Sequence, residues 1–377
     1  MKEIGLYLHI PFCIQKCKYC DFVSDRQNNE TIDSYVEALK KEINMYSDRL
    51  SDYRVETIFI GGGTPSILET EKMDKIVKEL FRNFNISKNV EFSIESNPGT
   101  LTKDKLKKYN DIGINRLSMG LQSFNNDVLK EIGRIHTKED FIHNYDAARE
   151  AGCKNINIDL IYGLPNQDLK DWEHTLREVI KLNPEHISAY SLKIEEGTAF
   201  KRLFDENKLN LPGDEEDRKM YDLAIKLLEQ HGIIQYEISN FSKKEYECKH
   251  NLIYWNNKEY LGLGVSAHSY MDSCRYANTG DINEYIRLMN EKKTAVISEE
   301  HKDEKDEIVE TIFLGLRLNK GLDLEMFENR FKISIYDMYG EKIKSLVELG
   351  LLYEDKNHIR LTRYGMDVSN QVFIEFL

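Results

Sequence analysis

In the first half of the chain, short apolar runs alternate with longer segments in which apolar residues recur every three or four positions. The short runs predict buried strands, and the recurrence predicts amphipathic helices. This alternation of strand and helix indicates a parallel sheet, either closed toward a barrel or open and doubly wound. We predict strands at 6–10, 55–60, 90–95, 115–120, 155–160 and 186–192, and helices at 32–46, 71–84, 103–109, 137–151 and 169–182.

Polar residues suited to chemistry follow the carboxyl ends of these strands. They are Cys13 after the first, the Gly61–Gly63 run after the second, Glu95 at the end of the third, Gln122 after the fourth and Asp159 near the end of the fifth. In parallel α/β barrels the active site is built at that face. The placement of these residues therefore favours a barrel over an open sheet.

The pattern changes after residue 192. Turn residues at 211–214 predict a boundary, which divides the chain into domains 1–212 and 213–377. The second part holds a predicted helix at 216–230 and an aromatic, Asn- and Gly-rich segment at 236–270. Helices near 304–318 and 335–349 and a hairpin between 351 and 361 resemble a winged helix. No basic recognition helix is evident, which favours a packing or partner role over DNA binding.

Composition narrows the function classes. The 377 residues are 41% hydrophobic and 31% charged, as in ordinary soluble proteins. A formal net charge of −13 argues against broad electrostatic binding of nucleic acid. No apolar run approaches the roughly 18 residues of a membrane helix, and no signal peptide is evident. We expect a cytoplasmic protein; peripheral membrane contact and homodimer formation stay open.

Three of the six cysteines, Cys13, Cys17 and Cys20, are spaced C-x3-C-x2-C. The odd number of cysteines in this cluster argues against a disulfide framework, and structural zinc usually takes four protein ligands. Thiolates also hold iron–sulfur clusters, normally four per cubane, so three would leave one iron free to bind a further ligand. The other cysteines, at 153, 248 and 274, are scattered, as is typical of small buried side chains.

The spacing C-x3-C-x2-C after a strand, with Tyr19 before the third cysteine, resembles the radical S-adenosylmethionine (SAM) superfamily. The surrounding Tyr-Leu-His-Ile-Pro-Phe-Cys resembles the branch that holds oxygen-independent coproporphyrinogen III oxidases and HemW-type haem chaperones. The resemblance covers nearly the whole chain. It implies a partial (β/α)6 barrel, a smaller mixed C-terminal domain, and a [4Fe–4S] cluster on Cys13, Cys17 and Cys20. SAM would bind the open iron and be cleaved to methionine and a 5′-deoxyadenosyl radical.

The resemblance also implies a set of cofactor-binding residues, each weak evidence when taken singly. Glycines let backbone approach a ligand closely, carboxylates can bind ribose hydroxyls, and an arginine can pair with the SAM carboxylate. Two aromatic residues would pack near the adenine and the cluster. The implied set is Gly62, Gly63, Thr64, Glu95, Gln122, Arg134 and Asp159, with Tyr7 and Tyr19 as the aromatics.

A second signature of the same branch resembles residues 250–255 and 260–269. An imidazole can ligate haem iron, which makes His250 a candidate haem ligand, and aromatic residues can enclose a porphyrin. The alternative is that His250 and His268 cap loops or fill the interface between domains.

Two departures separate the haem chaperones from the oxidases. The oxidases resemble C-x3-C-x2-C-x-C, but Phe22 stands at the fourth cysteine position, and this chain lacks their N-terminal extension. We therefore expect a chaperone that binds a [4Fe–4S] cluster, SAM and haem and transfers haem to acceptor proteins. The alternative is an oxygen-independent coproporphyrinogen III oxidase of porphyrin biosynthesis. Radical modification of tRNA is disfavoured by the acidic charge. Whether the chain is an enzyme, and which protein accepts the haem, stay open.

Overall fold

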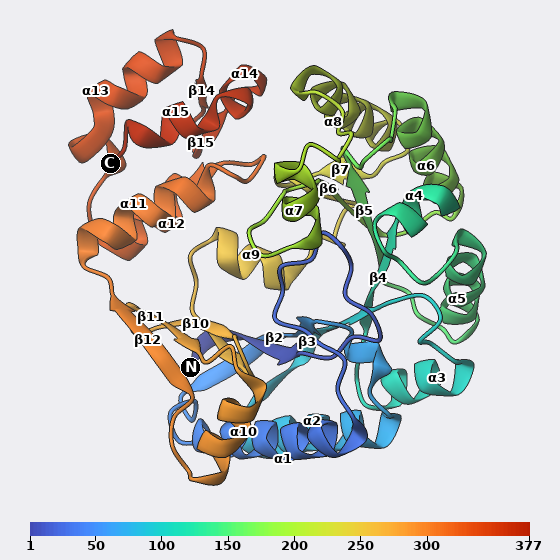
Figure 1. Cartoon of the computed structure of the whole chain (residues 1–377). Helices are drawn as coiled ribbons and strands as arrows, with labels where there is room; N and C mark the ends of the chain where they lie inside the picture. The colour runs from blue at the N-terminus through green and yellow to red at the C-terminus, as the bar shows by residue number, and fades with distance from the viewer.

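Six parallel strands form the centre of the protein in the computed structural model, which describes residues 1–377. They lie side by side in chain order, and the first and last do not pair with each other. The sheet is therefore a curved partial barrel, as predicted (Figure 1). The strands are β1 (Lys2–Ile10), β2 (Tyr53–Gly62), β3 (Ile86–Ser96), β4 (Arg116–Gln122), β5 (Ile156–Tyr162) and β6 (His186–Ser191).

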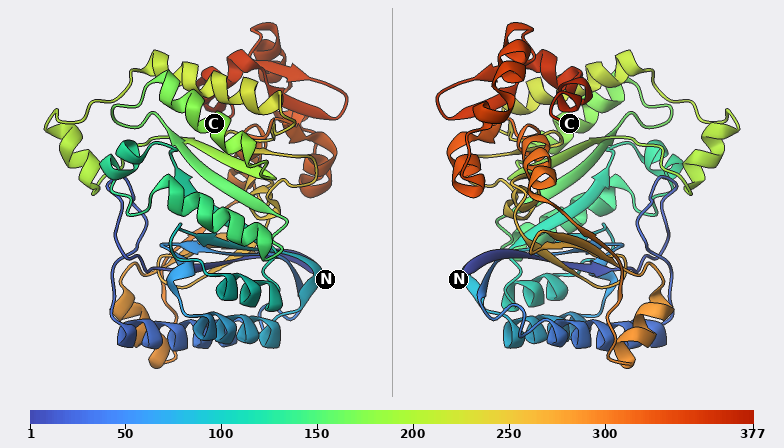
Figure 2. Two further views of the ribbon diagram at one scale, coloured as in Figure 1. Left: turned by 90° about the vertical axis from the view of Figure 1, so that its right-hand side faces the viewer. Right: turned by 90° about the vertical axis from the view of Figure 1, so that its left-hand side faces the viewer.

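The connecting helices cover the convex side of this sheet (Figure 2). Side-chain caps fix where several of them begin, because a cap oxygen accepts an otherwise unpaired N–H group of the first turn. Asn28, Thr102, Thr137 and Asp168 act in this way. The helices are α1 (Asn29–Met45), α2 (Thr70–Asn83), α3 (Lys103–Asp111), α4 (Asn126–Glu131), α5 (Lys138–Glu150) and α6 (Leu169–Lys181), with a 3-10 turn η1 (Pro65–Ile67).

The chain after β6 returns to both edges of the sheet. Strand β8 pairs antiparallel with β6, and β9 pairs parallel with β1, giving twelve strands in one sheet. Between them α9, yellow in Figure 1, lies on the concave side. The elements of this segment are α7 (Ala199–Asp205), α8 (Asp214–Glu229), β7 (Ile234–Gln235), β8 (Asn240–Ser242), α9 (Lys249–Trp255), β9 (Tyr260–Leu263), β10 (His268–Met271), β11 (Cys274–Asn278), α10 (Ile282–Asn290) and β12 (Val296–His301).

One hydrophobic core runs through the barrel and its extensions, from Ile4 to Ala295. The boundary expected between residues 212 and 213 falls in the loop before α8, and this core continues past it. A second core begins at Ile308 and reaches Phe376. Packing therefore assigns the residues from 213 to 301 to the barrel.

The second core belongs to a small C-terminal domain with a three-stranded antiparallel sheet, in the order β13-β15-β14. Helix α12 (Leu324–Phe331) was not predicted from sequence. It precedes the helix predicted near 335–349, and the residue after it, Lys332, adopts a left-handed conformation. The winged-helix-like arrangement of helices and hairpin is present. The elements are α11 (Glu304–Gly315), β13 (Leu322–Asp323), α12 (Leu324–Phe331), α13 (Ile335–Glu348), β14 (Leu352–Glu354), β15 (His358–Leu361), α14 (Arg363–Asp367) and α15 (Ser369–Ile374).

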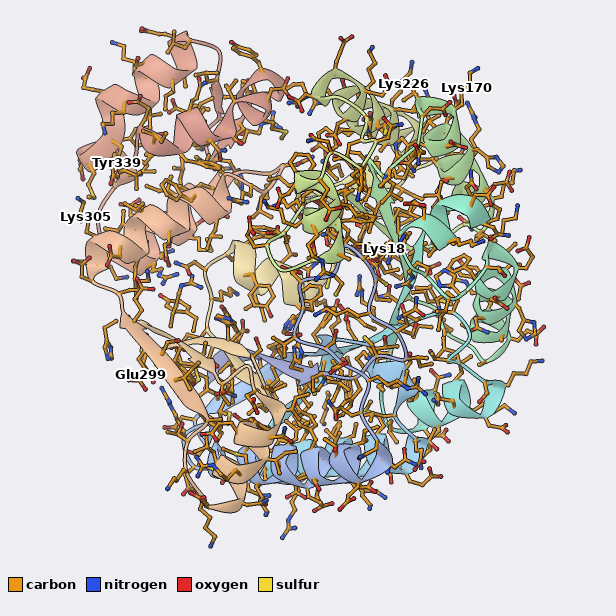
Figure 3. All side chains as sticks on the ribbon, in the orientation of Figure 1. Lys18, Lys170, Lys226, Glu299, Lys305 and Tyr339 are labelled. Atoms are coloured by element: carbon orange, nitrogen blue, oxygen red, sulfur yellow. The ribbon has the colours of Figure 1, made fainter.

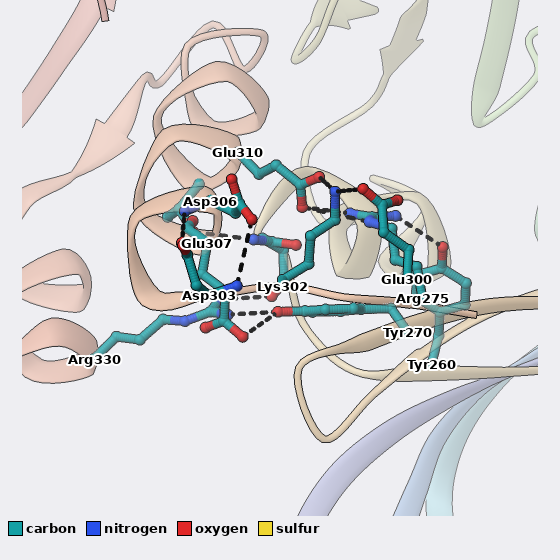
Figure 4. A network of polar contacts seen from close by, with 12 residues as sticks. Tyr260, Tyr270, Arg275, Glu300, Lys302, Asp303, Asp306, Glu307, Glu310 and Arg330 are labelled. Atoms are coloured by element: carbon teal, nitrogen blue, oxygen red, sulfur yellow. Dashed lines mark hydrogen bonds and ion pairs between the residues drawn. The ribbon is translucent and has the colours of Figure 1, made fainter. Parts of the chain in front are cut away.

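A network of ion pairs joins this domain to the extended sheet (Figure 4). Arg275 of β11 pairs with Glu310 of α11 at 3.0 Å. The hydroxyl of Tyr270 donates to Glu307 at 2.9 Å, and Arg330 of α12 pairs with the same carboxylate at 3.1 Å. Because these side chains are partly buried, they fix the orientation of α11 and α12 against the sheet.

A second junction joins α14 of the C-terminal domain to α8 of the barrel. Arg218 pairs with Asp367, and Arg363 pairs with Asp222. The Arg363 guanidinium also lies 4.9 Å from the ring centroid of Tyr221. The C-terminal domain therefore contacts the barrel at two of its borders.

Many other charged side chains lie on the outer surface, although Glu42, Glu91, Arg116 and Glu237 are buried. Lys170 and Lys226 lie at the outside of α6 and α8 in Figure 3, whereas Lys18 lies on the loop after β1. Lys18 pairs with Glu131 at 3.8 Å. None of the helices combines the length and the apolar composition of a bilayer-spanning segment.

Candidate functional site

A cavity of about 870 Å³ lies at the carboxyl ends of the parallel strands and extends to the C-terminal domain. The predicted site residues line it, except Tyr7 and His250. Residues from five different strand ends therefore meet in one place, as the position of the polar residues after each strand led us to expect. The predicted residues in its wall are Cys13, Cys17, Tyr19, Cys20, Gly62, Gly63, Thr64, Glu95, Gln122, Arg134 and Asp159.

The cysteine loop is held in place by backbone hydrogen bonds. The N–H of Cys13 donates to the carbonyl of Asp25, and the N–H of Lys18 donates to the carbonyl of Ile132, at the end of α4. All three cysteines are half-buried free thiols. Phe22, at the position of the fourth cysteine of the oxidases, lies on the rim of the cavity and is 59% exposed.

A chain of polar contacts connects two of these cysteines. The sulfur of Cys13 lies 3.5 Å from the hydroxyl of Thr64. The amide of Asn97 donates to that hydroxyl at 2.8 Å and accepts from Arg134 at 2.6 Å. Arg134 in turn donates to the sulfur of Cys17 at 3.5 Å. The position of each thiol is therefore coupled to that of the other.

The glycine turn after β2 has a shape that only glycine permits. Gly62 has φ of +109°, and a Cβ atom there would lie 2.5 Å from the ring of His9. A Cβ at Gly63 would lie 2.7 Å from the carbonyl oxygen of Phe12. The N–H of Gly62 donates to Glu95 at 3.0 Å. The turn thus places bare backbone beside the cysteine loop, where a ligand can approach it closely.

The two carboxyl groups of the cavity affect each other. Burial and the nearby charge of Asp159 raise the pKa of Glu95 to about 8. Burial also raises the pKa of Asp159, while hydrogen bonds from Ser118 at 2.8 Å and Asn157 at 2.7 Å oppose that rise. Like charges in a poorly hydrated site disfavour ionisation of both groups. A bound ligand with hydroxyl donors would stabilise the charged forms.

Gln122 presents an unused hydrogen-bond acceptor to the cavity. Its Oε1 atom is buried without a partner, and its backbone φ of +69° is unusual for a residue other than glycine. An unsatisfied buried oxygen is costly unless a ligand supplies a donor. Strain and an unpaired oxygen at the same residue are typical of a binding position.

The three thiols are candidate ligands of a metal cluster. Burial raises the pKa of Cys20 to about 11, so the free thiol is protonated at neutral pH. Metal ligation requires the thiolate and would release this proton. The three sulfurs do not close around a single ion. Three thiols at the edge of a cavity that also holds unpaired polar groups fit a cluster with one iron facing a ligand.

Two predicted residues lie outside the wall of this cavity. The ring nitrogens of His250 lie 2.7 Å from the hydroxyl of Thr57 and 2.8 Å from that of Tyr254, so both are engaged. Burial lowers the pKa of His250 to about 3, which keeps the imidazole neutral. The Tyr7 hydroxyl lies 3.0 Å from His9. These contacts hold His250 of α9 against β2, inside the barrel and not at an interface between domains.

Sequence reasoning missed several residues of the wall. Asn97 could have been predicted from the sequence, because it follows the third strand just after Glu95. The residues at the far end carried no such signal, because they are brought in by α8, α9 and the C-terminal domain. They include Arg218, Tyr254, Trp255 and Arg317, whereas Tyr190 lies on the predicted strand β6.

Comparison with known proteins identifies the family. Residues 7–179 match the Radical SAM superfamily, and residues 303–368 match the HemN C-terminal domain. The chain is 39% identical over 372 residues to the heme chaperone HemW of Bacillus subtilis (strain 168), covering 98% of each chain. The chain belongs to the HemW family of the radical SAM superfamily. Membership of the radical SAM superfamily implies a [4Fe–4S] cluster and SAM as cofactors.

Other HemW relatives agree along the full length. The heme chaperone HemW of Lactococcus lactis subsp. lactis (strain IL1403) is 37% identical, and the alignment covers 100% of this chain and 98% of that protein.

The structure of the Escherichia coli coproporphyrinogen III oxidase HemN, described as a radical SAM enzyme, superposes with a TM-score of 0.86. It is 27% identical and covers 100% of this chain and 90% of HemN. The HemW family and HemN therefore share both domains.

Proposed function

We propose that this protein is a haem chaperone that carries a [4Fe–4S] cluster and SAM in its barrel and delivers haem to acceptor proteins. The observation that carries this proposal is the full-length similarity to relatives named heme chaperones, at 39% identity against 27% for HemN. The phenylalanine at position 22, in place of the fourth cysteine of the oxidases, supports the same choice.

Cys13, Cys17 and Cys20 would hold the cluster. A cluster held there would supply one-electron reduction, the chemistry on which radical SAM proteins depend. The chain's own residues orient the thiols: Thr64 contacts the sulfur of Cys13, and Arg134 donates to that of Cys17.

The remaining cavity residues would bind SAM. The turn at Gly62 and Gly63 offers backbone that a ligand's amino group can approach, and Arg134 is a partner for the carboxylate. Glu95 and Asp159 can accept hydrogen bonds from ribose hydroxyls. Burial raises the pKa of both carboxyl groups, and hydroxyl donors from a ligand would oppose that rise. Gln122 contributes its unpaired Oε1.

Anaerobic reconstitution tests the cluster and the haem together. Native protein is expected to assemble a [4Fe–4S] cluster, seen by absorption and electron paramagnetic resonance, and to bind haem in a one-to-one ratio. Cys17→Ser should lose the cluster, whereas Cys153→Ser, a half-buried cysteine outside the cavity, should keep it. An intact SAM-binding cluster in Cys17→Ser would contradict the cluster assignment. Transfer of haem to an apo-haem protein, followed by its Soret band, tests the chaperone step.

The alternative function is that of an oxygen-independent coproporphyrinogen III oxidase, with which the TM-score of 0.86 to HemN is consistent. The cluster-loaded protein is mixed with coproporphyrinogen III, SAM and a reductant, and protoporphyrinogen is measured. Haem binding without product supports the chaperone. Many turnovers to product would overturn it.

A further inference from the structure

The end of the cavity farthest from the cysteine loop contains two hydrogen-bond donors without acceptors. Arg317 follows α11, and Trp255 is the last residue of α9; both line the cavity. The Nε atom of Arg317 and the Nε1 atom of Trp255 are buried, and neither has a hydrogen-bond partner. The guanidinium lies 5.8 Å from the Trp255 ring centroid and 5.5 Å from that of Phe373. The two donors are therefore neighbours in one wall.

Arg317 is distinguished from the arginines around it by having no ion pair. In the same region, Arg275 pairs with Glu310 and Arg330 pairs with Glu307. A partly buried cation without a counter-ion is costly, and an anionic ligand removes that cost. The charge of Arg317 is thus available to whatever occupies the cavity.

Glu237, the acidic residue of the wall whose pKa the charge of Arg317 affects, does not neutralise Arg317. The carboxylate of Glu237 accepts hydrogen bonds from the side chain of Asn240 and the backbone N–H of Ser239, and it forms no ion pair. Burial raises the pKa of Glu237, which weakens it as a counter-ion, although the charge of Arg317 partly opposes that rise. The guanidinium of Arg317 therefore still has an N–H donor without an acceptor.

The chemistry of this end selects a carboxylate on an apolar body. A guanidinium fork beside an indole N–H matches the acceptor pattern of a carboxylate. The surfaces around the pair are largely apolar or aromatic, which suits a flat hydrophobic ligand. The neighbouring residues that provide these surfaces are Ile238, Tyr254, Leu316, Leu361 and Met366.

We propose that Arg317 and Trp255 form a carboxylate-binding site that anchors a propionate of haem in the half of the cavity bounded by the C-terminal domain. This inference rests on the proposed haem-binding function. It assigns the propionate end of the haem to this domain and leaves the cysteine-loop end of the same cavity for SAM.

Esterified haem tests the site, because its dimethyl ester lacks the two carboxylates and keeps the ring and iron. Titration of the full-length protein, followed at the Soret band, should give an affinity for haem about tenfold to hundredfold higher than for the ester. Arg317→Met should bind haem more weakly than the native chain and lose most of the preference for haem over the ester. Arg317→Lys should restore part of the preference, and Trp255→Phe should lose part of it.

The controls separate this site from the proposed function. Arg177→Met removes an exposed arginine on α6 and should behave as the native chain, and circular dichroism checks that every variant folds. Native protein that binds haem and the ester equally would overturn the carboxylate site and leave haem binding intact. Absence of haem binding by native protein would overturn the proposed function itself. If Arg317→Met weakened SAM binding and left the haem preference unchanged, the carboxylate would be that of SAM and this inference would fail.

Discussion

Asn97 donates a 2.8 Å hydrogen bond to the hydroxyl of Thr64, joining the residues that follow two neighbouring parallel strands. Through this contact Cys13 and Cys17, on the same loop, are held by side chains from elsewhere in the barrel. None of these supporting residues would itself ligate the cluster. Residues that orient metal ligands in this way affect metal affinity strongly.

Asn97→Ala is expected to weaken retention of the cluster. The substitution removes one of the two oxygen acceptors of Arg134, which keeps the carbonyl of Gly120, and removes the amide donor to Thr64, so both thiols lose part of their support. We expect the reconstituted cluster to be lost to a chelator about tenfold faster, measured as the decay of its absorption. The exposed Asn290, which accepts from Lys41, provides the control Asn290→Ala, which should match the native chain. Equal decay in both variants would show that the network does not support the cluster.

Gly62→Ala and Gly340→Ala are expected to change stability in opposite directions. At Gly62 the positive φ and the contact with His9 should lower the free energy of unfolding by about 1–3 kcal/mol. At Gly340, inside α13, a Cβ meets only Tyr336 at 3.8 Å, and alanine should stabilise by about 0.5–1 kcal/mol. Urea denaturation of the cluster-free proteins measures both. A neutral Gly62→Ala would contradict the strained turn.

Glu95 predicts a pH dependence of stability. Its pKa of about 8 in the folded state lies above its ordinary value of 4.5. As the pH rises between these values, the unfolded chain loses the proton first, so the folded state loses stability. Glu95→Gln should therefore gain stability relative to the native chain between about pH 5 and pH 8, by more than about 1 kcal/mol.

Urea denaturation of the cluster-free proteins at several pH values measures this difference. The exposed Glu348 provides the control Glu348→Gln, whose profile should run parallel to that of the native chain. A parallel profile for Glu95→Gln as well would mean that Glu95 ionises normally in the folded protein.

His250 is expected to stabilise the barrel rather than ligate haem iron. Both ring nitrogens are engaged, by Thr57 and Tyr254, and the side chain is 1% exposed. His250→Ala should lower the free energy of unfolding by about 1–3 kcal/mol and leave the absorption spectrum of bound haem unchanged. A shifted Soret band with unchanged stability would instead identify His250 as the iron ligand.

Much of the barrel could be predicted from sequence, because its strands and helices are long enough to carry their own periodicity. The predicted helix at 71–84, for example, is α2 at Thr70–Asn83. The strands that extend the sheet were not predicted. β7 has two residues and β8 has three, too few for a pattern, and they are strands only because β6 offers an edge.

The sequence by itself determined the cysteine spacing, the glycine turn and the order of strands and helices, because these depend on residues close together along the chain. Only the tertiary structure decided that residues 213–301 extend the sheet and share its core, that His250 is engaged on both sides, and that Arg317 and Trp255 line the cavity. Those relationships join residues as far apart as Thr57 and His250. They depend on which surfaces pack together, and no local pattern records that choice.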